Sequence, residues 1–296
     1  MRLLTLFLFI FQVSVVMAEN PTPTLPTATQ ALLDGVKSTQ SKSVIKSVLM
    51  IACPKDNMKG TGFVISGGTI ITTNSHVVGS CKAEELVGYS AATNDPVQFT
   101  SLERDVDRDL ATLCVKKALP YSLKLDAAEK NPPVETDVET WGYPLKYQEL
   151  APLLSRGYVA GYTTERTPLG QTPVKQLVIN GAINPGNSGG PLIDRATGRV
   201  IGVIVSKWTL WSPNIETAIK GWAHPRSSMG GTFSYTNAQG QQVGITDQEM
   251  LSVILTEFYQ TSQVMIGQAI SVSELNAFLK EKQKDLSCIQ QSPKSK

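Results

Sequence analysis

The sequence has little of what metal sites, nucleic-acid binding or membrane spans require. Its only histidines are His76 and His224, and none of its four cysteines forms a Cys-x-x-Cys pair, so it lacks the usual ligand sets for zinc. We expect no metal and no cofactor. The 27 basic and 25 acidic residues nearly balance and form no polybasic stripe, which gives no electrostatic reason to expect nucleic acid as a partner. Beyond the first residues no segment holds about 18 consecutive apolar residues, so we expect no membrane span in the mature chain.

The first 18 residues have the pattern of a signal peptide. Arg2 is followed by an apolar stretch over residues 3–16, and Ala18 is a small residue that suits cleavage. A membrane anchor is the alternative, but the apolar run is short for crossing a bilayer. We therefore predict that residues 1–18 are removed and that the protein is exported, either secreted or periplasmic.

Four cysteines in an exported chain favour disulfide bonds. Cys53, Cys81, Cys114 and Cys288 allow three pairings, and the sequence alone does not choose between them. We favour Cys53 with Cys81, because these two flank the segment that carries His76. Cys114 lies in an apolar stretch and fits a buried free thiol equally well.

Short strand-like runs separated by turn residues make up most of the chain. The predicted strands cover residues 48–53, 62–65, 69–73, 97–102, 110–115, 138–142, 154–162, 176–179, 191–193, 200–205 and 264–270. Their length and spacing predict an all-β fold of antiparallel barrels. Residues 117–133, with three prolines, are interpreted as a connection between a first barrel at about 44–118 and a second at about 134–286.

The other segments have different compositions. Residues 19–43 are rich in Pro, Thr, Ser and Gln, which predicts a flexible N-terminal segment. Thr246-Asp-Gln-Glu249 and Ser271-Val-Ser-Glu274 have the pattern of capping boxes, each followed by apolar residues at helical spacing. They predict a helix to about residue 259 and a C-terminal helix, followed by a tail at residues 287–296.

The strongest local motif is Asn184-Pro-Gly-Asn-Ser188-Gly-Gly-Pro191. Acyl transfer by serine needs an exposed hydroxyl and nearby backbone N–H groups that face the developing oxyanion, and a tight glycine-rich turn can supply both. By itself such a run is as often an ordinary surface loop. It also fits the Gly-x-Ser-x-Gly elbow of α/β-hydrolases, but that fold needs a strand before the serine, a helix after it and then the acid and histidine, and the flanking Pro185 and Pro191 argue against it.

Two upstream segments strengthen the catalytic interpretation. His76 follows an apolar strand-like run, Ile70-Ile-Thr-Thr-Asn-Ser, and Asp109 precedes another, Leu110-Ala-Thr-Leu-Cys-Val. A single histidine or an Asp before a strand is more often structural. Here both precede the serine in the order His, Asp, Ser, and the chain has only one other histidine.

These blocks resemble a known family. Thr61-Gly-Phe-Val-Ile-Ser66, Thr-Asn-Ser-His76-Val-Val, Asp109-Leu-Ala and Gly181-Ala-Ile-Asn-Pro-Gly-Asn-Ser188-Gly-Gly-Pro-Leu192 are similar to the corresponding motifs of the high-temperature-requirement (HtrA) branch of trypsin-like peptidases. The resemblance implies a chymotrypsin-like fold with two six-stranded antiparallel β-barrels, at residues 44–286. It implies a serine endopeptidase acting on protein or peptide substrates, and it carries no implication about the oligomeric state.

The resemblance also implies roles for single residues. Ser188 would be the nucleophile, His76 the general base and Asp109 the residue that orients it, while the backbone N–H groups of Gly186 and Ser188 would bind the oxyanion. The substrate pocket would be lined by Ala182, Val205 and Ser206; Ser206 either supports Asp109 or is an ordinary strand hydroxyl.

Three departures qualify the resemblance. Asn187 stands where proteolytically activated relatives have an Asp, so we expect no activating ion pair with a new N-terminus. Ala182 stands where relatives that cut after basic residues have an acid, so we expect small or medium apolar side chains to be preferred. A segment at about 207–263 is inserted before the last strand and would be either a lid or a cluster packed on the second barrel. A binding or chaperone-like protein with a closed site on the same fold is the alternative function.

Overall fold

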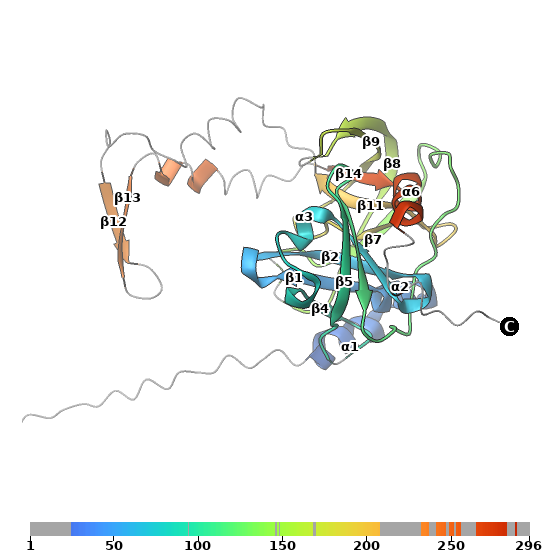
Figure 1. Cartoon of the computed structure of the whole chain (residues 1–296), viewed down its shortest axis with the longest axis horizontal. Coiled ribbons are helices and arrows are strands. Elements are labelled where there is room, and N and C mark those ends of the chain that lie inside the picture. Colours follow the sequence, from blue (N-terminus) through green and yellow to red (C-terminus); the bar gives the residue numbers. More distant parts are fainter. Residues whose placement is uncertain are drawn as a thin grey trace, which may run out of the picture.

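A computed structural model describes residues 25–93, 95–145, 147, 149–167, 170–207, 232–236, 241–246, 249–251, 253–255, 265–282 and 288. Two antiparallel sheets of six strands each form the body of the molecule (Figure 1). The predicted signal peptide at residues 1–18 and most of the predicted insertion, with Trp208, Trp211, Trp222 and His224, lie outside the described residues.

The first sheet has the strand order β4-β1-β2-β3-β6-β5. Its strands are β1 Val48–Cys53, β2 Met58–Ile65, β3 Ile70–Thr73, β4 Val87–Ser90, β5 Phe99–Asp105 and β6 Leu110–Val115. The two edges approach each other through one isolated bridge between Gly88 and Val97, so this sheet curls into a half-barrel that is not fully closed. Strand β4 has no counterpart among the predicted strands.

The second sheet closes on itself in the order β10-β11-β14-β9-β8-β7. Its strands are β7 Asp137–Gly142, β8 Leu153–Arg166, β9 Pro173–Gly181, β10 Pro191–Asp194, β11 Val200–Lys207 and β14 Ile266–Ser271. The inward faces supply a buried apolar cluster that includes Val159, Leu177, Ile179 and Ile204. The all-β, double-barrel fold class predicted from the sequence is confirmed.

One apolar core joins the two sheets. It contains Phe63 and Ile70 from the first sheet and Trp141, Val203 and Ile270 from the second, each 3% exposed or less. Because burial of such side chains stabilises by about 2 kcal/mol each, the two sheets are held as a single packed unit.

A separate two-stranded sheet belongs to the insertion. It consists of β12 Thr232–Thr236 and β13 Gln242–Thr246. At its end the predicted capping box is present: the Glu249 carboxylate accepts from Thr246 N at 2.8 Å, and Thr246 Oγ1 accepts from Glu249 N at 3.2 Å. Met250, Leu251 and Ile254, which follow in helical conformation, are exposed.

Helices lie mainly at the two ends of the described chain. They are α1 Leu25–Gly35, α2 Thr39–Ser47, the one-turn α3 Ser75–Val78 and α6 Val272–Lys282, and three short 3-10 turns are η1 Pro54–Asp56, η2 Ser66–Gly68 and η3 Ala83–Glu85. None of the helices in the described part of the chain has the length and apolar character needed to span a membrane.

Helices α1 and α2 differ from the irregular segment expected at residues 19–43. Leu32, Leu33 and Val36 of this region pack against the joint core, and the completely buried Ile45 fixes α2 to it. These apolar residues recur at helical spacing, but the polar residues between them hide the pattern. Ser38 caps α2, since its hydroxyl accepts from Ser41 N.

Two disulfides are present. Cys53 pairs with Cys81, the pairing favoured from the sequence. Cys114 pairs with Cys288, so the interpretation of Cys114 as a free thiol is wrong. The partner of Cys114 lies 174 residues away in sequence, and only the folded chain brings Cys288 back into the buried core beside β6.

Candidate active site

The structure brings His76 and Asp109 into direct contact. His76 lies in α3, just after β3, and its ring Nδ1 is 2.7 Å from Oδ2 of Asp109. The other carboxylate oxygen, Oδ1, accepts from the backbone N of His76 at 2.9 Å. The Asp109 side chain is 1% exposed and that of His76 is 28% exposed. A buried carboxylate therefore holds both the ring and the backbone of a histidine whose other edge reaches the surface.

Ser188 lies on a tight turn between β9 and β10. The turn is closed by hydrogen bonds from Asn187 N to Asn184 O at 3.0 Å and from Gly190 N to Asn187 O at 2.9 Å. Gly186 has a φ of 99°, a left-handed conformation that glycine adopts at no steric cost. A Cβ there would lie 2.3 Å from Tyr143 O, so another residue does not fit.

The serine turn packs against the segment that leads to His76. Ser188 O accepts from Thr61 N at 2.8 Å. A Cβ on Gly189 would lie 2.2 Å from Thr61 O and 2.2 Å from Thr73 Oγ1. Only glycine allows this approach, and it sets Ser188 beside the end of β3, where α3 begins. The segments that carry His76, Asp109 and Ser188, which are far apart in sequence, therefore meet at the junction of the two sheets.

The Ser188 hydroxyl points to a backbone carbonyl. It donates to Val205 O at 2.8 Å, and within the described part of the chain no hydrogen bond joins it to His76. Val205 itself is 2% exposed, with its side chain in the joint core. The serine is thus adjacent to the histidine segment but has its proton engaged elsewhere.

Thr61 is a buried link that sequence reasoning did not single out as functional. Its hydroxyl donates to Gly186 O at 2.7 Å and accepts from Tyr143 N at 3.0 Å, and its own carbonyl accepts from Thr73 Oγ1 at 2.7 Å. One side chain of the first sheet therefore fixes the serine turn of the second. The sequence gives only its place in the Thr61-Gly-Phe block, since hydroxyl orientation depends on tertiary packing.

The remaining predicted site residues have mixed positions. Ala182 is partly buried, just after β9, and Asn187 is 1% exposed. The side chain of Ser206 lies outside the described residues, although its backbone pairs with Gln268 of β14. Burial raises the pKa of the nearby Tyr143 phenol, which keeps it neutral. The catalytic and pocket roles of the predicted residues remain predictions.

No group of three or more potential metal ligands of the His, Cys, Asp or Glu type exists within the described ranges. What the arrangement offers is a hydrogen-bonded His–Asp pair and an adjacent serine on a glycine-rich turn. These are the parts that nucleophilic acyl transfer uses.

Comparison with protein families shows what the chain is similar to. The model of the trypsin-like peptidase domain matches residues 60–203. Protease Do-like 4, mitochondrial, of Arabidopsis thaliana is 29% identical over 140 residues, which is 47% of this chain and 26% of that protein. Serine protease HTRA3 of Homo sapiens is 31% identical over 157 residues, 51% of this chain and 33% of that protein. The chain thus spans a third or less of the length of these relatives.

Solved structures share the fold at lower identity. The inactive form of the Rv3671c protease of M. tuberculosis has a TM-score of 0.54 and 19% identity, covering 85% of this chain and 94% of that chain. The active form has a TM-score of 0.54 and 21% identity, covering 84% and 85%. The two forms match equally well, so the likeness concerns the fold and not the state of the site.

Proposed function

Since the chain belongs to the trypsin-like serine peptidases of the HtrA type, we propose that it is an exported endopeptidase that cleaves protein or peptide substrates with Ser188, His76 and Asp109. The observation that carries this proposal is the 2.7 Å contact between His76 Nδ1 and the buried Asp109 carboxylate. An ionised carboxylate can only accept, so Nδ1 carries the proton and Nε2 is left to act as a base.

The reaction begins when the Ser188 hydroxyl leaves Val205 O and turns to His76 Nε2. That exchange replaces one hydrogen bond by another, so its net cost is about 1 kcal/mol or less. Ser188 Oγ then bonds to the substrate carbonyl carbon while His76 takes the hydroxyl proton. The same proton passes to the leaving amine as the peptide bond breaks, and water releases the acyl group from Ser188 by the reverse sequence.

The developing oxyanion would be bound by the N–H groups of Gly186 and Ser188. Each such donor is worth about 3 to 4 kcal/mol of transition-state stabilisation in serine peptidases. Support comes from the anchoring of this turn by Thr61 at Gly186 O and Ser188 O, which preorganises it. For the substrate pocket we retain Ala182, Val205 and Ser206 and a preference for small or medium apolar side chains.

Export is supported by two independent features. The first 18 residues carry the signal-peptide pattern. The described chain has two disulfides, Cys53–Cys81 and Cys114–Cys288, and such bonds persist mainly in oxidising compartments outside the cytosol.

Labelling with a fluorophosphonate probe and digestion of unfolded casein test the proposal. We expect Ser188→Ala and His76→Ala to lose both activities, because Ser188 forms the bond to the substrate and His76 transfers the proton. His224→Ala is the matched control, and we expect it to label like wild type. Equal casein digestion by wild type and Ser188→Ala would contradict the proposal.

A second candidate function is holding unfolded chains without cleaving them. The hydrogen bond from Ser188 Oγ to Val205 O favours it, since this rotamer keeps the nucleophile away from its base. Suppression of casein aggregation by a wild-type protein that neither labels nor digests would select this function. Rapid labelling of Ser188 would exclude a permanently closed site.

A further inference from the structure

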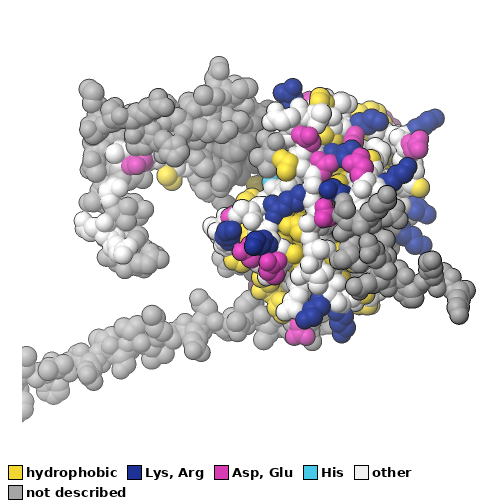
Figure 2. Space-filling view, in the orientation of Figure 1, with side chains coloured by type: hydrophobic (Ala, Val, Ile, Leu, Met, Phe, Trp, Pro, Cys, Tyr) yellow, Lys and Arg dark blue, Asp and Glu magenta, His cyan; other side chains and the backbone are white. Residues whose placement is uncertain are grey.

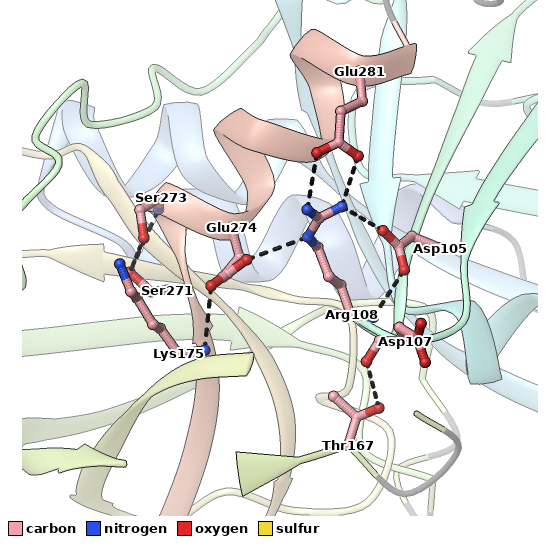
Figure 3. Close-up of polar contacts among 9 residues, drawn as sticks. All are labelled: Asp105, Asp107, Arg108, Thr167, Lys175, Ser271, Ser273, Glu274 and Glu281. Atoms are coloured by element: carbon pink, nitrogen blue, oxygen red, sulfur yellow. Dashed lines mark hydrogen bonds and ion pairs between the residues drawn. The ribbon is translucent and has the colours of Figure 1, made fainter. Parts of the chain in front are cut away.

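The turn that carries Asp109 is held by a partly exposed ionic cluster, in which the side chains of Arg108 and Glu281 are 24% and 54% exposed. Arg108 lies between β5 and β6, and its guanidinium donates to Asp105 at 2.6 Å and to Glu281 at 2.8 and 2.9 Å (Figure 3). Its Nε donates to Glu274 at 3.2 Å. Asp105 belongs to the first sheet, whereas Glu274 and Glu281 lie on α6. Figure 2 shows acidic and basic side chains side by side over this part of the surface.

Glu274 takes part in this cluster instead of closing the predicted capping box. Its carboxylate accepts from Arg108 and, at 3.3 Å, from Lys175 N of β9. The Ser271 hydroxyl still accepts from Ser273 N at 3.4 Å. The Glu274 side chain therefore does not cap its own helix; it binds the Asp109 turn through Arg108 and the second barrel through Lys175 N.

The connection between β8 and β9 also forms hydrogen bonds to the Asp109 turn. Asp107 O accepts from Thr167 Oγ1 at 3.0 Å, and Asp107 Oδ1 accepts from Gln171 N at 2.7 Å. The hydrogen bond from Gln171 N lowers the pKa of the Asp107 carboxyl. A Cβ on Gly170 would lie 2.3 Å from Asp107 O, so the two backbones are as close as glycine permits.

These contacts surround a residue with an unfavourable backbone conformation. Asp109 has a φ of 52°, in the left-handed region that costs non-glycine residues about 1 kcal/mol or more and persists only where the surroundings enforce it. Its N donates to Val106 O at 3.2 Å, and its O accepts from Ser75 N at 3.2 Å. The orientation of this backbone decides where the carboxylate points.

We propose that Arg108 is a positioning residue for the catalytic reaction: by tying the Asp109 turn to α6, it keeps the Asp109 carboxylate directed at His76. The inference rests on the proposed function and adds a residue to it. Arg108 is suited to this task because its planar fork engages Glu281 through two parallel hydrogen bonds and Glu274 through a third. Without it, three carboxylates would face one another beside the turn.

The chain provides a matched control on the same helix. Lys282 Nζ lies 3.2 Å from Glu103 of β5, with side chains 33% and 25% exposed. This pair also joins α6 to the first sheet, but it does not touch residues 105–109. If α6 merely stabilises the fold, breaking either connection should have the same effect on activity.

The experiment compares Arg108→Gln, Arg108→Lys, Glu281→Gln and Glu103→Gln in the full chain. We expect Arg108→Gln to lower kcat and the fluorophosphonate labelling rate at least tenfold with KM changed by less than about twofold, since small displacements of catalytic groups cost up to about 10²-fold. Arg108→Lys should restore part of the loss, and Glu281→Gln should lose about threefold. Glu103→Gln should destabilise as much as Glu281→Gln yet label within about twofold of wild type.

A second readout follows the geometry without relying on turnover. The chain has two histidines, so spectra of ¹⁵N-histidine-labelled protein contain two ring systems, and His224→Gln assigns them. We expect the His76 Nδ1 proton to exchange faster with water in Arg108→Gln and to be unchanged in Glu103→Gln. An unchanged His76 proton in Arg108→Gln, or equal loss of labelling in Arg108→Gln and Glu103→Gln, overturns the positioning role. Failure of wild type to label at Ser188 overturns the proposed function instead.

Discussion

Replacing Thr61 by valine tests whether one hydroxyl of the first sheet holds the serine turn of the second. Valine keeps the shape of threonine and removes only the oxygen. In wild type that oxygen is completely buried and makes hydrogen bonds of 2.7 Å to Gly186 O and 3.0 Å from Tyr143 N. In Thr61→Val both backbone groups lose a partner.

The expected magnitude follows from these two bonds. A buried polar group left without a partner costs about 1 to 3 kcal/mol, so the pair predicts a loss of roughly 2 to 6 kcal/mol in the free energy of unfolding. Domains of this kind have about 5 to 15 kcal/mol in total, so the change is large enough for urea unfolding to measure.

Activity should fall as well, because Gly186 supplies an oxyanion donor in the proposed mechanism. Complete loss of one donor costs about 10² to 10³ in kcat. A serine turn that is loosened, not removed, should lose about tenfold or more, with KM less affected. The labelling rate of Ser188 and the kcat for a short peptide substrate measure this.

Two variants serve as controls. Thr61→Ser keeps the hydroxyl and should lose only about 1 kcal/mol for its missing methyl group. Thr112→Val makes the same change at another completely buried threonine of the first sheet, whose Oγ1 has no hydrogen-bond partner in the described part of the chain; it should be neutral or stabilising. If Thr61→Val were as stable and as reactive as Thr112→Val, the assignment of Thr61 as the link between the sheets would be refuted.

Two further predictions concern stability. Cys53→Ala/Cys81→Ala removes a disulfide that spans 28 residues, and the chain-entropy relation predicts a loss of about 3.6 kcal/mol; urea unfolding without reductant should show this loss, while wild type in reductant, which also loses Cys114–Cys288, should lose at least as much. The hydrogen bond from Arg108 lowers the pKa of the Glu281 carboxyl below its ordinary value of 4.5, so the stabilisation is present above that pH and is lost as the pH falls through the lowered value. Glu281→Gln should therefore show a shallower loss of stability below about pH 4.5 than wild type, and equal slopes would contradict this.

Much of the fold could be predicted because strand signals are local. Alternating or continuous apolar runs such as 48–53 and 110–115 matched β1 and β6 without any knowledge of their partners. Strand β4 escaped because its buried positions are Gly88 and Ser90, which give no apolar strand signal. Helices α1 and α2 escaped because their apolar residues are scattered among polar ones, and their burial depends on a core formed by distant segments.

In the candidate site, the residues with a local sequence signal could be predicted, whereas the residues that support them through distant contacts could not. His76, Asp109 and Ser188 were selected by residue type and order. The structure brings the first two into contact and packs the turn of the third against the end of β3, next to the segment that carries His76. The supporting contacts of Thr61 and Arg108 could not be selected, because their partners lie 125 residues away for Thr61 and up to 173 residues away for Arg108. Glu274 shows the limit most clearly. The local pattern predicts that its carboxylate caps its own helix, but in the fold that carboxylate binds Arg108 from the turn between β5 and β6.

The Arg108 cluster has a consequence for the timing of biogenesis. Glu274 follows Arg108 by 166 residues, and at about 5 to 20 residues per second a ribosome needs roughly 8 to 33 s to add them. During that interval the Asp109 turn exists without the helix that braces it. A nascent chain therefore completes the Arg108 cluster, and with it the support of the Asp109 turn, only after nearly all of the chain has been made.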